Sequence, residues 1–66
     1  MSATTDIGSK IKKYRKEKKY TLKNLSEQTG LSIGFLSQLE RGITTIAIDS
    51  LANVADVLGV EMMDFF

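Results

Sequence analysis

The stretch that decides the fold is Thr21–Glu40, TLKNLSEQTGLSIGFLSQLE. Thr21 and Ser32 are good helix N-cap residues, and each opens a segment with apolar side chains at helical spacing. Gly30 lies between the two segments, where a left-handed residue commonly ends a helix. The small Ser26 lies where the two helices must approach closely, and four leucines, at positions 25, 31, 36 and 39, lie between them. This spacing predicts a helix-turn-helix over about 21–41, with helices at 21–29 and 32–41.

The rest of the chain continues the helical pattern. Gly42 and Gly59 each follow a helical segment and precede an apolar residue, which is typical of a helix C-cap. Apolar spacing predicts further helices at about 6–19 and 48–58, and a last turn at 61–66. Proline is absent, and no alternating run is long enough to indicate a sheet. The sequence therefore predicts an all-α, five-helix domain over residues 6–66, preceded by a flexible tail at 1–5.

Composition excludes several function classes. Sixty-six residues allow one small domain, and 42% hydrophobic with 26% charged residues is an ordinary globular balance. The absence of Cys and His excludes disulfides, thiolate or imidazole metal sites and catalysis by a Cys or His. No metal, cofactor or enzymatic activity is expected. No apolar run reaches the roughly 20 residues of a membrane span, and Met1–Ser9 lacks the apolar core of a signal peptide, so a cytoplasmic protein is expected.

The formal net charge of +1 is an average over two unlike halves. Residues 1–23 hold eight basic and two acidic side chains, a balance of +6. Residues 24–66 hold one basic and six acidic side chains, a balance of −5. A solvated, lysine-rich helix would explain the basic segment. Because that segment directly precedes the predicted helix-turn-helix, part of it is expected to flank a DNA backbone.

The sequence resembles the repressor helix-turn-helix domains of the xenobiotic-response-element (XRE) type from bacteria and phages. The resemblance rests on the 21–40 stretch, on Ile11–Arg15, on Leu36–Gly42 and on Leu51–Phe66. It implies a sequence-specific, double-stranded DNA-binding domain of a transcriptional regulator, acting as a homodimer on a palindromic operator. Ser32–Gly42 and the ending Met63–Phe66 are similar to members that carry a C-terminal cupin domain as a sensor, which is absent from this chain.

The resemblance also assigns roles to residues. A recognition helix at about 32–41 would face base edges in the major groove with Ile33, Gly34, Ser37 and Gln38. Phosphate contacts would come from the helix N-termini and the loop after the recognition helix, through Thr21, Lys23, Ser32, Arg41, Thr44 and Thr45. Two features depart from the family pattern: Leu22 stands where members commonly carry a phosphate-binding Gln, and no proline precedes the helix at 48–58.

Arg15 and Glu40 match a pair that forms a structural ion pair in the family. The alternative is that they are two unrelated surface charges. An Arg–carboxylate pair suits a partly buried bridge between the first helix and the end of the recognition helix, so the pair is the favoured interpretation.

A second functional hypothesis is a protein-interaction module, such as an antitoxin or coactivator, that uses the same fold. The acidic second half of the chain and the apolar ending with Met62, Met63, Phe65 and Phe66 favour it. For Met62 and Phe65, core packing in a short fifth helix is the favoured interpretation. Glu61 and Asp64 lie three residues apart, but no accompanying nucleophile, base or metal cluster supports catalysis.

Overall fold

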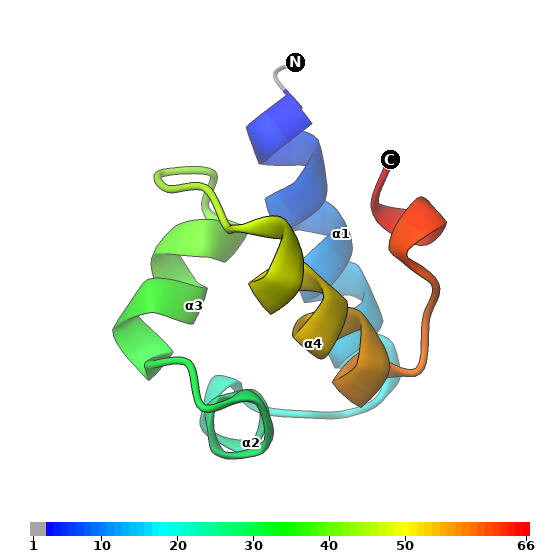
Figure 1. The fold of residues 1–66 in the computed structure, drawn as a ribbon. Coiled ribbons are helices and arrows are strands. Elements are labelled where there is room, and N and C mark those ends of the chain that lie inside the picture. The colour runs from blue at the N-terminus through cyan, green and yellow to red at the C-terminus, as the bar shows by residue number, and fades with distance from the viewer. Residues whose placement is uncertain (1–2) are drawn as a thin grey trace.

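A computed structural model describes the backbone of residues 3–66 and the side chains from Ile7 onward. The elements are α1 (Ala3–Glu17), α2 (Leu22–Thr29), α3 (Ile33–Glu40), α4 (Ile48–Leu58) and a 3₁₀ helix, η1 (Met62–Phe65). The described residues contain no strand, so the predicted all-helical class is confirmed. Figure 1 shows α4 in front of α1, with α3 to the left, α2 below and the C-terminal turn to the right of α1, on the side opposite α3.

The predicted count of five α-helices is wrong, because the last element is a single 3₁₀ turn. A reciprocal cap closes this turn: the Asp64 carboxylate accepts from the Glu61 N–H at 2.8 Å. Two backbone hydrogen bonds then each span three residues. The Asp64 N–H donates to the Glu61 carbonyl, and the Phe66 N–H donates to the Met63 carbonyl. This is the 3₁₀ pattern rather than the α pattern.

The first helix is shifted from its predicted bounds. It begins at Ala3 rather than about residue 6, and it ends at Glu17 rather than 19. Of the tail predicted at 1–5, residues 1 and 2 lie outside the described residues. The end of α1 is set by Lys19, whose φ of 61° lies in the left-handed region. The Tyr20 N–H bonds back to the carbonyl of Arg15 at 3.0 Å, which closes the helix in a Schellman arrangement.

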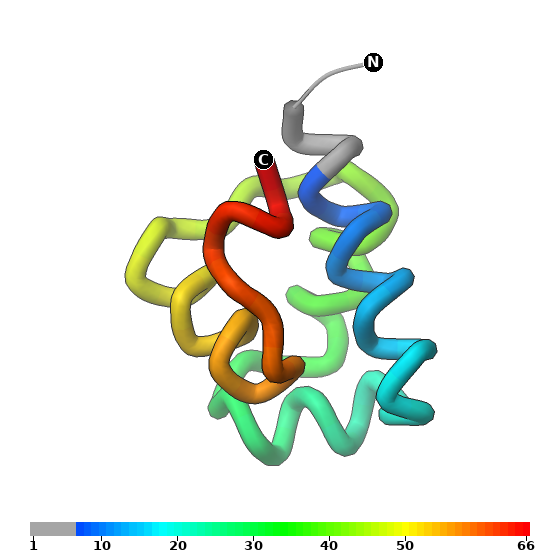
Figure 2. The backbone as a smooth tube through the Cα atoms, turned by 90° about the vertical axis from the view of Figure 1, so that its right-hand side faces the viewer, coloured from blue at the N-terminus to red at the C-terminus, as the bar shows by residue number. Residues whose placement is uncertain are grey.

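The core lies between all five elements. Its fully buried side chains are Ile11, Leu25, Leu36, Leu39, Leu51, Val54, Leu58 and Phe65. The helix α3 packs on both α1 and α2, while α4 packs on α2, and η1 packs on α1 and α4. The tube in Figure 2 shows the C-terminal segment running back along the molecule beside α1. There the rings of Tyr14 and Phe65 pack edge to face, with their centroids 5.7 Å apart, and this contact anchors η1 on α1.

A glycine sets the distance between α1 and α3. Gly8 is buried, and a Cβ at this position would collide with the carbonyl oxygen of Leu39 and come within 3.2 Å of Glu40 backbone atoms. The first helix therefore lies against the backbone of the last turn of α3, and this contact positions the C-terminal end of α3 relative to α1.

Candidate nucleic-acid interface

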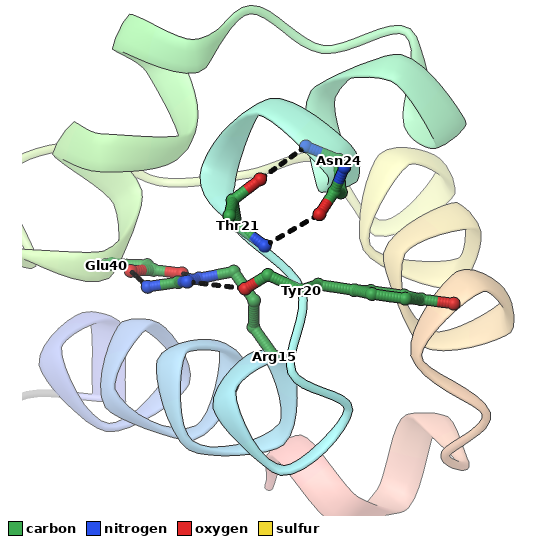
Figure 3. Close-up of polar contacts among 5 residues, drawn as sticks. All are labelled: Arg15, Tyr20, Thr21, Asn24 and Glu40. Carbon is green, nitrogen blue, oxygen red and sulfur yellow. Dashed lines mark hydrogen bonds and ion pairs between the residues drawn. The ribbon is translucent and has the colours of Figure 1, made fainter.

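The start of α2 is fixed by a reciprocal cap between Thr21 and Asn24. The Asn24 N–H donates to Thr21 Oγ1 at 3.0 Å, and the Thr21 N–H donates to Asn24 Oδ1 at 3.1 Å (Figure 3). The predicted N-cap at Thr21 is confirmed, and so is the cap at Ser32, whose Oγ accepts from the Phe35 N–H at 3.0 Å. The reciprocal contribution of Asn24 was not anticipated, because capping boxes usually carry Glu or Gln at that position.

The turn between α2 and α3 is held by residues that sequence reasoning missed. Gly30 has the left-handed φ of 80° that the pattern predicted. Beside it, Thr29 Oγ1 donates to the carbonyl of Leu25 at 2.8 Å and accepts from the Leu31 N–H at 3.2 Å. Asn53 of α4 donates to the Thr29 carbonyl at 2.8 Å. The turn is thus bonded to α2 and also to α4, which limits rotation of α3 relative to the rest of the domain.

The helix α3 has one buried and one outward face. At about 100° per residue, the four residues predicted to face bases, which are Ile33, Gly34, Ser37 and Gln38, fall within an arc of about 140°. Ile33 is 46% exposed, Gly34 and Gln38 are exposed, and Ser37 is half-buried. Leu36 and Leu39, on the opposite side, are fully buried. The structure therefore brings the four residues together on one accessible face.

The six residues predicted to contact phosphates fall into two groups. Thr21, Lys23 and Ser32 lie at the N-termini of α2 and α3, and all three are exposed. Both N-cap oxygens accept a backbone N–H, which leaves each hydroxyl proton able to donate to an anion. The second group, Arg41, Thr44 and Thr45, follows α3; Arg41 and Thr45 are exposed, and Thr44 is half-buried.

Arg15 and Glu40 form a bidentate ion pair. Arg15 Nε donates to Glu40 Oε2 at 2.7 Å and its Nη2 donates to Oε1 at 3.0 Å, while Nη1 donates to the Tyr20 carbonyl at 2.8 Å (Figure 3). The two side chains are only 11% and 5% exposed. Hydrogen bonding to Glu40 raises the pKa of Arg15, against an opposing effect of burial. One guanidinium thus joins α1, the segment before α2 and the end of α3.

The two departures from the family pattern serve packing. Leu22, in the first turn of α2, is half-buried against the core. Ile46, in the loop without a proline, also packs on the core. The N-cap residue of α4 is Ala47, whose side chain makes no capping bond. Lys23, next to Leu22, is exposed at the same helix end.

The basic residues of α1 lie largely on one side of that helix. Lys12, Lys13 and Lys16 are exposed and fall within an arc of about 100°, opposite the stripe of Ile7, Ile11 and Tyr14 that meets the core. Three of the eight basic residues in the positive half of the chain therefore share one exposed face of α1.

Two helices joined by a tight turn, with an accessible outer face on the second, define a helix-turn-helix domain. Residues 11–65 match the family model HTH_3, helix-turn-helix, and the chain belongs to this family. It is 44% identical over 57 residues to the HTH-type transcriptional regulator SinR of Bacillus subtilis, covering 85% of this chain and 51% of SinR. It is 36% identical over 56 residues to the immunity repressor of Bacillus phage phi105, covering 85% of this chain and 39% of that protein.

Solved structures show the same arrangement. The clp gene regulator ClgR of Corynebacterium glutamicum superposes with a TM-score of 0.94 at 32% identity, covering 98% of this chain and 83% of that one. SinR, the master regulator for biofilm formation, in complex with DNA, superposes with a TM-score of 0.85 at 42% identity, covering 89% and 95%. The chain spans about half the length of the curated SinR that it matches. In the part of the chain that the structure describes, no helix is both long and apolar enough to cross a bilayer.

Proposed function

We propose that this protein binds double-stranded DNA sequence-specifically and regulates transcription, with α3 in the major groove. The observation that carries the proposal is the outer face of α3, where Ile33 and Gln38 are exposed and Ser37 is half-buried, on a helix whose last turn is held by the Arg15–Glu40 ion pair. The likeness to SinR, whose structure is known in complex with DNA, supports it. A regulator of this kind acts in the cytoplasm, where bacterial DNA lies.

Each residue on the outer face has a distinct capacity. Gln38 has an amide that can bond bidentately to adenine, Ile33 offers an apolar surface to a thymine methyl, and Ser37 offers one hydroxyl. Phosphate contacts on both sides of these residues fix the register of α3. They come from the N-termini of α2 and α3, through Thr21, Lys23 and Ser32, and from the segment after α3, through Arg41, Thr44 and Thr45. The lysines on the outer side of α1 add attraction to the duplex that weakens as salt increases.

We further propose a homodimer on a palindromic operator. The Cα trace of one domain spans at most 28 Å. Successive major grooves on one face of DNA are about 34 Å apart, so two copies fit side by side without overlap. Side chains extend beyond the Cα trace into the small gap that remains, so neighbouring domains can touch on DNA. Analytical ultracentrifugation with and without DNA would measure how strongly the domains associate by themselves and how much of the dimer depends on DNA.

Selection of bound duplexes from a random pool tests DNA binding, followed by titration of the selected site at two salt concentrations. We expect one recurring motif with inverted half-sites, and an affinity that falls as salt rises with a slope of about −0.9 per phosphate contact. Recovery of no motif, or an affinity independent of salt, would overturn the proposal.

The protein-interaction module remains the second candidate because of the C-terminal turn. Met63 is 84% and Phe66 is 67% exposed, whereas Phe65, between them in the sequence, is buried. A stable protein complex lost in Met63→Ser, together with failure of DNA selection, would favour this function. Selective DNA binding unchanged by Met63→Ser would favour the regulator.

A further inference from the structure

We propose that Gly34 is a specificity-determining residue: the bare backbone at this position lets α3 lie directly against the edge of one base pair. The inference rests on the proposed function and names the residue that sets how closely the helix approaches DNA.

Gly34 is the one glycine for which the fold of the described residues gives no reason. Three others have φ of 72–80°, a region that favours glycine, and Gly8 is pressed against the backbone of α3. Gly34 instead has helical geometry in the first turn of α3, and a Cβ placed on it would meet nothing within 4 Å. Glycine favours a helix less than alanine does. The position therefore costs stability without serving packing or chain direction.

The place of Gly34 on α3 indicates what occupies the open space. At about 100° per residue it falls between Ser37 and Gln38, within the outward arc that also holds Ile33. Side chains thus surround a strip of uncovered backbone on an accessible face. A recognition helix meets base edges with the residues of its first turns, so the occupant with matching geometry is a base-pair edge lying against the Cα of Gly34.

A methyl group at this position would fill the gap that the base edge needs. Gly34→Ala should therefore act in opposite directions on folding and on binding. In the free domain the added methyl group meets no neighbour and favours the helix, so the melting temperature should rise by about 2–6 °C. In the complex the methyl group pushes α3 outward, and affinity for the selected site should fall by about fivefold or more, the effect of one mismatched base pair.

The experiment measures the melting temperature and the affinity for the selected duplex of the full 66-residue chain and of Gly34→Ala. Ala52→Gly is the matched control, since Ala52 is exposed on α4 and undergoes the reverse change. That variant should melt lower than the parent and bind equally well. Affinity of both variants for an unrelated duplex separates base-edge contact from general attraction, and Gly34→Ala should leave this affinity unchanged.

Higher stability with weaker specific binding supports the proposal. Unchanged specific affinity in Gly34→Ala would overturn it, as would an equal loss for the selected and the unrelated duplex, because the group near Gly34 would then be the sugar-phosphate backbone. A parent protein that selects no DNA would overturn the proposed function itself, so the two failures are distinguishable.

Discussion

Removal of Arg15 should take away much of the stability of this domain. A folded domain is stabilised by about 0.05–0.15 kcal/mol per residue, which gives about 3–10 kcal/mol for 66 residues. In Arg15→Met, the Glu40 carboxylate loses two charge-assisted bonds and stays at a position where its side chain is 5% exposed. Breaking one side of a buried pair costs about 3–5 kcal/mol. Because the Arg15 side chain is 11% exposed, the lower end applies, and we expect about 3 kcal/mol.

A double-mutant cycle separates the pair from its surroundings. Glu40→Leu alone should cost about 2 kcal/mol, less than Arg15→Met, because the longer Arg15 side chain can turn its charge toward water. The double variant no longer contains a buried charge and loses mainly the bond to the Tyr20 carbonyl, which is worth about 1 kcal/mol. The coupling energy should therefore be about 4 kcal/mol, against about 0.2–1 kcal/mol for an exposed pair.

Urea unfolding followed by circular dichroism measures all four proteins, at low salt and at 1 M NaCl. The coupling should persist in high salt, because a shielded pair is screened little. It should also be constant from pH 6 to 10, because the pKa of Arg15 is raised above its already high ordinary value, so that its contribution is complete throughout this range and is lost only in stronger alkali. Stability of Arg15→Met within about 1 kcal/mol of the parent would refute this reasoning, since exposed pairs give no more than that.

Three further substitutions test other parts of the structure. Gly8→Ala should lower the free energy of unfolding by about 1–3 kcal/mol in urea titrations, because the added methyl group collides with the Leu39 carbonyl. Alanine favours helices more than glycine does, so a gain in stability would contradict the close approach of α1 and α3. Lys19→Gly should raise the free energy of unfolding by about 0.5–1 kcal/mol, because φ is 61° there, whereas Lys18→Gly should give no such gain in the same titration. Gln38→Ala should cost about 1–3 kcal/mol of binding and relax one position of the selected motif, with an unchanged melting curve; an unchanged motif would remove Gln38 from the base-reading residues.

The part of the fold set by local sequence could be predicted, and the part set by contacts across the chain could not. The caps at Thr21 and Ser32 and the left-handed Gly30 depend on near neighbours, and all three are as the sequence indicated. The end of α1 was misplaced because Lys19 adopts a conformation that its residue type disfavours. The return bond from the Tyr20 N–H to the Arg15 carbonyl fixes that ending, and the Arg15 side chain, which holds both the Tyr20 carbonyl and the distant Glu40, supports it.

The candidate site shows the same division. Helical spacing alone put the four outward residues of α3 on one face, since their positions follow from about 100° per residue. The contacts that hold this face in place are the bond from Asn53 to Thr29 and the close approach of Gly8 to the end of α3, and both join segments more than 20 residues apart. No local pattern indicates such contacts. Arg15 and Glu40 are the exception, and they were found by family resemblance rather than by spacing.

The contacts that fix α3 all lie on its inner side or at its ends. Gly8 and Arg15 hold its last turn, Asn53 holds the turn before it, and Leu36 and Leu39 fill the core beneath it. The outer face contributes little to folding, and at Gly34 it even forgoes stability. Substitutions there should accordingly change which DNA is bound while leaving the melting temperature unchanged or higher. Substitutions at the supporting residues should lower stability first, and should weaken binding to the selected site without changing its motif, because α3 would keep its reading residues while losing its fixed orientation.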